Sequence, residues 1–159
     1  MTDHPLPSYI PEDEDKEALQ KMDKRTRARI VAFQMCVQDD ANPQAPDSDL
    51  TAELDEGMIR DTLRGPKQVE MAMNLIDGVR KHKAEIDEKI VSHAENWTLA
   101  RMALTDRNAL RVGAFELLYT DTPAAIVINE AVEIAKMFGS ENSAAFVNGI
   151  LDKIAKERQ

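Results

Sequence analysis

Apolar side chains recur every three or four positions along most of the chain, a spacing that places them on one face of an α-helix. The first stripe of this kind begins near Met22 and predicts a helix. Its apolar positions are Ile30, Phe33, Cys36 and Val37. Pro, Asn and Asp then dominate residues 40–48, so a loop is expected there.

Two further helices are predicted in the middle of the chain. A short one is expected over residues 50–63, because Arg64-Gly65-Pro66 is a typical helix stop. A longer stripe of apolar residues follows from Val69 to Ile90, and a break in it is expected near His82.

The helical pattern is interrupted at residues 96–98 and resumes in the C-terminal third of the chain. One helix is predicted from Asp106, with Thr105 as its N-cap. The next runs from Pro123 to Gly139, since proline suits the first helical position and glycine suits a helix end. The last apolar stripe consists of Phe146, Val147, Ile150, Leu151 and Ile154.

The predicted fold class is all-α, with about seven helices joined by short connections. Only the Val/Ile run at residues 126–128 hints at a strand. Residues 1–21 contain three prolines and the run Glu12-Asp13-Glu14-Asp15, so they are interpreted as a disordered acidic tail.

The composition is that of a globular protein and excludes several classes. The chain has 159 residues, of which 43% are apolar, enough for one domain or two small sub-bundles. It has a single cysteine, so no disulfide framework is expected. No apolar run is long enough for a transmembrane helix and no signal peptide is visible, so a soluble cytoplasmic protein is expected.

A net charge of −9 argues against nucleic acid as a partner, but the charge is unevenly distributed. Residues 24–29, Lys-Arg-Thr-Arg-Ala-Arg, carry four positive charges, whereas residues 1–23 and 39–61 carry net charges of −5 and −7. The basic run is interpreted either as a solvated helix end or as a contact for the phosphates of single-stranded RNA. The acidic tail before it either screens this run from nonspecific RNA or only aids solubility.

Side chains that could support catalysis are scarce. His82 and His93 have no Cys or His at ligand spacing, so both are interpreted as exposed surface histidines rather than metal ligands. Cys36 lies on the apolar stripe of the first helix and is expected to be a packed thiol. With no phosphate-binding glycine loop, nucleophile elbow or dinucleotide fingerprint, no enzyme, metal or cofactor is expected.

Three segments share a specific pattern with one known family. The strongest is Pro123-x4-Ile128-Asn129-Glu130-Ala131-Val132-Glu133-Ile134-Ala135-Lys136, followed by Phe138-Gly139 and Phe146-Val147-Asn148-Gly149-Ile150-Leu151-Asp152. The second is Asn96-Trp97-x-Leu99-x-Arg101, followed by Asp106-Arg107-x2-Leu110-Arg111 and Phe115-Glu116-Leu117. The third is Arg27-Ala28-Arg29 with Gln34. Over about residues 22–156, the chain resembles the NusB family of bacterial transcription antitermination factors.

This resemblance implies two perpendicular helical bundles, over residues 22–95 and 96–159. It implies binding of boxA-type single-stranded RNA from the leaders of ribosomal RNA operons. It also implies a heterodimer with NusE, a ribosomal protein of the small subunit, and action on the RNA polymerase elongation complex.

The resemblance also assigns candidate site residues. The candidate RNA-binding residues are Lys24, Arg25, Arg27, Arg29, Asn142 and Phe146. The candidate partner-binding residues are Asp106, Arg107 and Arg111. Phe146 is interpreted either as a core residue or as a stacking platform for RNA. Trp97 is expected to be a buried anchor between the bundles, with an indole N–H that needs a partner.

Four positions depart from the family pattern. Cys36-Val37 stands where the family often has Leu-Tyr, so an aromatic contact is expected to be lost. Asn142 replaces an acid and Ala145 replaces a lysine, two changes that offset each other in charge. The direction of their effect on RNA affinity therefore stays open.

Three alternatives to this function also stay open. A protein-only scaffold would bind NusE without specific RNA recognition. Ribosomal RNA cytosine methyltransferases carry a NusB-like N-terminal domain, but the sequence up to Gln159 is expected to leave no room for their cofactor-binding domain. A homodimer formed through exposed apolar stripes would hide the arginines.

Overall fold

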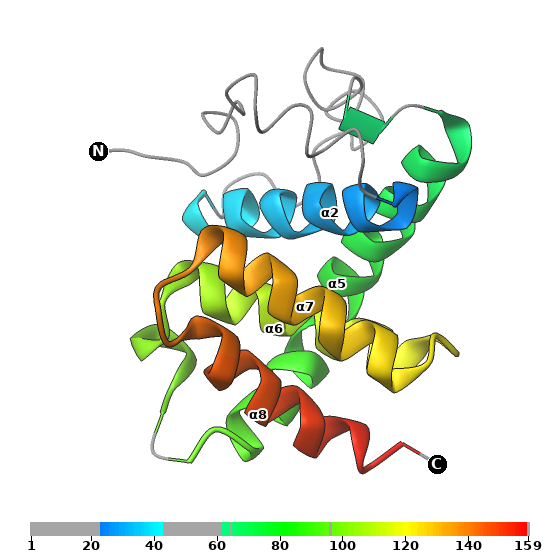
Figure 1. Cartoon of the computed structure of the whole chain (residues 1–159). Coiled ribbons are helices and arrows are strands. Elements are labelled where there is room, and N and C mark those ends of the chain that lie inside the picture. The colour runs from blue at the N-terminus through cyan, green and yellow to red at the C-terminus, as the bar shows by residue number, and fades with distance from the viewer. Residues whose placement is uncertain (1–22, 43–61, 64, 96, 159) are drawn as a thin grey trace. The chain divides into compact units, whose positions relative to one another are not determined.

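The structure, a computed structural model, describes residues 23–42, 62–63, 65–95 and 97–158. Its elements are, in chain order, α2 (Lys24–Ala41), α5 (Pro66–Ser92), the 3-10 helix η1 (Leu99–Arg101), α6 (Leu104–Tyr119), α7 (Ala124–Phe138) and α8 (Ser143–Ala155) (Figure 1). These residues form helices and no strand, and the run at 126–128 lies inside α7, so the all-α prediction is confirmed.

The number of helices differs from the prediction. The described part of the chain contains five α-helices rather than about seven. The acidic tail at residues 1–21 lies outside the described residues, and of the helix expected over 50–63 only residues 62 and 63 are described, both helical. Within the described ranges, no helix combines the length and the apolar character needed to span a membrane.

Two compact units divide the chain within α5, between Ile76 and Asp77. This boundary does not coincide with the division expected at residue 96, and the arrangement of two perpendicular bundles stays a prediction. Each unit is therefore described by itself.

The first unit contains α2, whose ends are capped by side-chain and backbone hydrogen bonds. The carboxylate of Asp23 accepts a hydrogen bond from the backbone N–H of Arg25 at 2.7 Å, and a negative N-cap also suits the positive end of a helix dipole. At the other end, the N–H of Asn42 donates to the carbonyl of Gln38 at 2.9 Å. The predicted apolar stripe is buried, which confirms Cys36 as a packed thiol.

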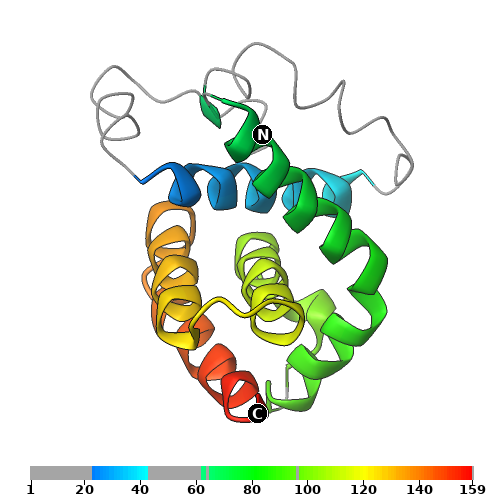
Figure 2. The same cartoon turned by 90° about the vertical axis from the view of Figure 1, so that its right-hand side faces the viewer.

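The second unit is built around α6, α7 and α8, which pack against one another, with α7 and α8 antiparallel (Figures 1 and 2). Gly113 of α6 allows this close packing. A Cβ atom at Gly113 would lie 2.7 Å from Cδ1 of Leu151 and 3.5 Å from Cβ of Ala131. A side chain at this position would therefore collide with Leu151 of α8, whereas its distance to Ala131 of α7 is that of ordinary van der Waals contact.

In the second unit, α7 ends where the sequence predicts, but the starts of α6 and α7 differ from the predicted residues. α6 begins one residue before Thr105, because the N–H of Arg107 donates to the carbonyl of Ala103 at 3.0 Å. Pro123 is the N-cap of α7 rather than its first helical residue. Gly139 ends α7 as predicted, and its N–H closes the last turn.

The break expected in α5 is confirmed at His82, whose φ of −106° and ψ of 17° are not helical (Figure 2). The His82 ring stacks on Tyr119 with 4.0 Å between ring centroids, and its Nδ1 lies 3.1 Å from a Glu85 carboxylate oxygen. The Tyr119 hydroxyl donates to the same oxygen at 3.2 Å. Burial, with help from Glu85, raises the pKa of Tyr119. His82 is thus only partly exposed, because one side of its ring lies against the aromatic rings of α6.

Candidate nucleic-acid interface

The basic run at the start of α2 is divided between the surface and the interior. Lys24 and Arg25 lie in the first turn and are exposed. Arg27 and Arg29 are only 7% and 4% exposed. Of the four expected RNA contacts on this helix, the structure therefore offers Lys24 and Arg25 directly to a phosphate.

Trp97, Arg101 and Phe146 meet on the surface of the second unit. The Trp97 and Phe146 rings form an edge contact, with 6.0 Å between their centroids and an interplanar angle of 70°. The Arg101 guanidinium carbon lies 5.5 Å from the centroid of the Trp97 ring, within cation–π range. Trp97 is 45% exposed, so the expectation of a buried anchor is wrong. A large indole can pack one side and leave the other in solvent.

The segment that carries Trp97 is held by short turns. The N–H of Trp97 donates to the carbonyl of Ala94 at 3.2 Å, and the N–H of Arg101 donates to that of Thr98 at 3.1 Å. Glu95 pairs with Lys153 of α8 across 3.7 Å. The contacts with Phe146 and Lys153 therefore fix this segment against α8 at two places.

A second cluster lies at the C-terminal end of the chain. Glu157 accepts a hydrogen bond from Lys89 at 2.5 Å and is also bonded to His93. The hydrogen bond from Lys89 is the larger and that from His93 the smaller cause of a lowered pKa of Glu157. The Lys89–Glu157 bond also raises the pKa of Lys89. His93 is thus partly buried against Glu157 rather than an exposed histidine. In the described ranges, no group of three His, Cys, Asp or Glu residues could hold a metal ion.

Asn142 and Phe146 lie one turn apart at the start of α8, where the N–H of Phe146 donates to the carbonyl of Asn142 at 3.2 Å. Asn142 is exposed, and its side chain makes no capping hydrogen bond to the helix. Its amide can both donate and accept a hydrogen bond. Phe146 is half-buried, so it is partly packed and partly accessible.

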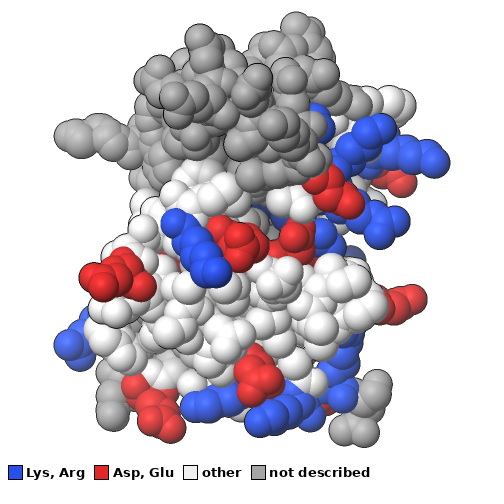
Figure 3. All heavy atoms as spheres, in the orientation of Figure 1, with Lys and Arg blue, Asp and Glu red and all other residues white. Residues whose placement is uncertain are grey.

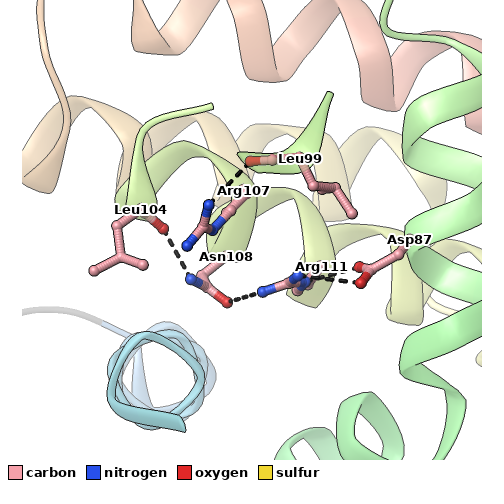
Figure 4. A network of polar contacts seen from close by, with 6 residues as sticks. All are labelled: Asp87, Leu99, Leu104, Arg107, Asn108 and Arg111. Carbon is pink, nitrogen blue, oxygen red and sulfur yellow. Dashed lines mark hydrogen bonds and ion pairs between the residues drawn. The ribbon is translucent and has the colours of Figure 1, made fainter. Parts of the chain in front are cut away.

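Arg111 lies in a buried polar network that joins α6 to α5 (Figure 4). Its Nε and one terminal nitrogen donate to the two carboxylate oxygens of Asp87 at 2.8 and 3.1 Å. The other terminal nitrogen donates to Asn108 at 3.1 Å. Because this guanidinium is already used inside the protein, the structure does not present Arg111 as a partner-binding residue.

The other two candidate partner-binding residues lie at the beginning of α6. Asp106 is in the first helical turn, where a negative charge is stabilised by the helix dipole. Arg107 donates to the backbone carbonyl of Leu99 at 3.0 Å, which fixes the preceding 3-10 turn against the helix (Figure 4). Both side chains are partly exposed.

The surface over α7 and α8 is mostly uncharged in the view of Figure 3. Ile126 and Met137 of α7 are among the large apolar side chains that remain exposed. They are eleven residues apart, which is about three helical turns, so they lie on the same face of α7. The same face also carries Glu130 and Glu133, four and seven residues after Ile126, so it offers both apolar and acidic area to a protein partner.

Sequence reasoning missed Asp87 and the role of Arg101. Arg101 belongs to a segment that carries the family resemblance, but nothing in its spacing shows that it meets an indole ring. Asp87 has no sequence signal, since its partner Arg111 is 24 residues away in the chain.

Comparison with known proteins identifies what this chain is similar to. The NusB family matches residues 26–156. The transcription antitermination protein NusB of Anaeromyxobacter dehalogenans strain 2CP-1 is 44% identical over 134 residues, which cover 83% of this chain and 90% of that protein.

Solved structures give the same result. The structure of T. maritima NusB has a TM-score of 0.74 and 41% identity, covering 84% of this chain and 92% of that one. A chain in the crystal structure of antitermination factors NusB and NusE in complex with dsRNA has a TM-score of 0.73 and 28% identity. That alignment covers 84% of this chain and 97% of the other.

Proposed function

Since the chain belongs to the NusB family, we propose that it is a transcription antitermination factor that binds boxA-type single-stranded RNA together with NusE. The RNA would come from the leaders of ribosomal RNA operons, and the assembly would act on the RNA polymerase elongation complex. The observation that carries this proposal is the family match over residues 26–156. The similarity to a chain in the structure of NusB and NusE in complex with dsRNA supports the parts of the proposal that concern NusE and an RNA partner.

RNA contacts are proposed on both units. Lys24 and Arg25 bind phosphates, because their charged groups are exposed on the first turn of α2. Asn142 and Phe146 contact bases from the start of α8, where one offers an amide and the other a half-exposed ring. Arg27 and Arg29 stay predictions from the family resemblance.

NusE is proposed to dock on the second unit. The exposed side chains of Ile126 and Met137 on α7 supply apolar contact area, and the exposed Glu133 and Lys136 of the same helix add charged contacts. Asp106 and Arg107 at the beginning of α6 supply polar contacts. The protein then works as a non-enzymatic adaptor, and joint engagement of one RNA by two proteins raises the affinity of both. Self-association stays a prediction.

This function is tested by fluorescence anisotropy with boxA RNA and a scrambled RNA, each with and without NusE. The parent is compared with the double variant Lys24→Ala/Arg25→Ala, which keeps the Asp23 cap because that bond uses a backbone N–H. Loss of two phosphate contacts should reduce the slope of log K against log salt by roughly 1.4.

A matched control removes two other exposed cations, in the double variant Lys136→Ala/Lys156→Ala. We expect the parent to bind boxA RNA more tightly than the scrambled RNA, and NusE to increase this affinity. The affinity for boxA RNA should be lower in the α2 variant and close to that of the parent in the control. If the parent binds both RNAs equally weakly and still binds NusE, the result would instead support the protein-only scaffold.

A further inference from the structure

The Trp97 side chain is nearly half exposed even though two neighbours contact it. An aromatic ring as large as indole usually buries most of its surface when a core is available, and this one lies outside the core. The edge contact with Phe146 and the guanidinium of Arg101 leave part of the indole surface open to solvent. That open surface is suited to a flat ligand.

Arg101 differs from Arg111 and Lys153 of the second unit in having no carboxylate partner among the described residues. Arg111 is paired with Asp87, and Lys153 is paired with Glu95. Arg101 is exposed and forms no ion pair with any residue that the structure describes. Its guanidinium is therefore available for an anion, beside the ring on which it rests.

The three side chains are positioned before any ligand arrives. Backbone hydrogen bonds hold Trp97 and Arg101 in successive turns, and the contact between the Trp97 and Phe146 rings places the same segment against α8. Phe146 is two helical turns before Lys153, so both contact the segment from one face of α8. A preorganised surface of this kind loses little conformational entropy on binding.

We propose that Trp97, Arg101 and Phe146 form a subsite for one unpaired nucleobase of single-stranded RNA. The base stacks on the open part of the indole, and Arg101 binds the adjacent phosphate. Phe146 supports the indole from its edge. This proposal rests on the proposed RNA binding and extends it to a segment for which the resemblance gives no role. A nucleotide is favoured over an apolar peptide as the ligand, because the Trp97 ring lies beside the Arg101 guanidinium, which has no ion pair with any described residue and can bind a phosphate.

The single tryptophan of the chain makes a direct test possible. Unlabelled boxA RNA is titrated into the full-length protein while the intrinsic tryptophan emission is recorded. We expect saturable quenching with the same midpoint as the anisotropy titration. An emission that does not change while anisotropy reports RNA binding would overturn the subsite and leave the proposed function in place.

Variants separate stacking from charge. Trp97→Ala should weaken RNA binding about fivefold or more, whereas Trp97→Phe, which keeps an aromatic face, should retain most of the affinity. Arg101→Ala should weaken binding and reduce the salt slope by roughly 0.7. Val91→Ala removes another exposed apolar side chain, and Lys136→Ala another exposed cation; both should bind RNA like the parent. Circular dichroism checks that every variant is folded.

RNAs with one abasic nucleotide at successive positions identify the stacked base. At one position, the abasic nucleotide should lower the RNA affinity of the parent but not that of the Trp97→Ala variant. The reason is that removal of the base and removal of the indole abolish the same stacking contact. If every abasic position affects both proteins equally, the subsite is wrong. If Trp97→Ala loses NusE binding and keeps RNA binding, the surface belongs to a protein interface and the proposal is overturned. A parent that binds no RNA at all overturns both this subsite and the proposed function.

Discussion

Removing either partner of the Arg111–Asp87 pair should destabilise the fold, and by unequal amounts. In Arg111→Met the carboxylate of Asp87 loses two hydrogen bonds, and in Asp87→Ala the guanidinium loses the same two, while its bond to Asn108 remains. The two side chains differ in exposure, at 6% for Arg111 and 21% for Asp87. Water can therefore solvate Asp87 in the absence of Arg111 better than it can solvate Arg111 in the absence of Asp87.

The magnitudes follow from this difference in exposure. Breaking a buried ion pair by removing one partner costs about 3–5 kcal/mol when the remaining charge is sealed from water. We expect Asp87→Ala to lower the free energy of unfolding by about 3–4 kcal/mol, near that range. We expect Arg111→Met to cost less, about 2 kcal/mol, because Asp87 is partly hydrated and methionine preserves apolar contacts. The double variant should cost less than the sum of the two single variants.

The measurement is urea unfolding followed by far-UV circular dichroism, which gives the free energy of unfolding and its urea dependence for each variant. Lys156→Ala is the control, because this lysine pairs with Asp152 on the exposed face of α8. Exposed pairs of this kind contribute about 0–1 kcal/mol, so this control should unfold close to the parent.

Two results would refute this reasoning. One is that both single variants unfold within about 0.5 kcal/mol of the parent, the range of ordinary surface substitutions. The other is that Arg111→Met keeps full stability and loses NusE binding. Arg111 would then be the partner-binding residue that the family resemblance implied, and the internal network would be of minor importance.

Two further predictions concern packing and pH. Gly78→Ala should destabilise the protein by about 1–2 kcal/mol in urea unfolding, because its Cβ would lie 2.2 Å from the Phe115 ring, an overlap larger than the gain in helix propensity. Stability equal to the parent would contradict this. Glu157→Gln should lower stability at neutral pH, since hydrogen bonds from Lys89 and His93 lower the pKa of Glu157. A lowered carboxyl pKa stabilises the fold above the unfolded-state pKa, and this contribution is lost as pH falls through the folded-state value. The gap between variant and parent should therefore close in acid, and a gap that is constant with pH would count against it.

The local features of the fold could be predicted because they depend on neighbouring residues. The apolar stripe of α2, the break at His82 and the end of α7 at Gly139 all follow from helical periodicity and backbone preferences. Thr105 shows the limit of such signals. It is a good N-cap residue, yet the helix starts before it because a backbone bond to Ala103 adds another residue.

The candidate site was predicted only in part, because residue type does not determine accessibility. The basic run of α2 is visible in the sequence, but its division into exposed Lys24 and buried Arg29 depends on what packs around the helix. Trp97 was expected to be a buried anchor between the two bundles. It lies at the surface instead, since the turns after α5 place it beside Phe146, which is 49 residues later in the chain.

The sequence by itself determined the all-α class, the family and the location of the basic helix start. These depend on periodic apolar positions, on residue patterns and on runs of charge, all of which are local along the chain. Only the tertiary structure decided which charges are used internally and which face outward. Arg111 of α6 pairs with Asp87 of α5, while Lys24 and Arg25 at the start of α2 remain exposed. The physical reason is that burial and pairing depend on helices that are distant in sequence and adjacent in space.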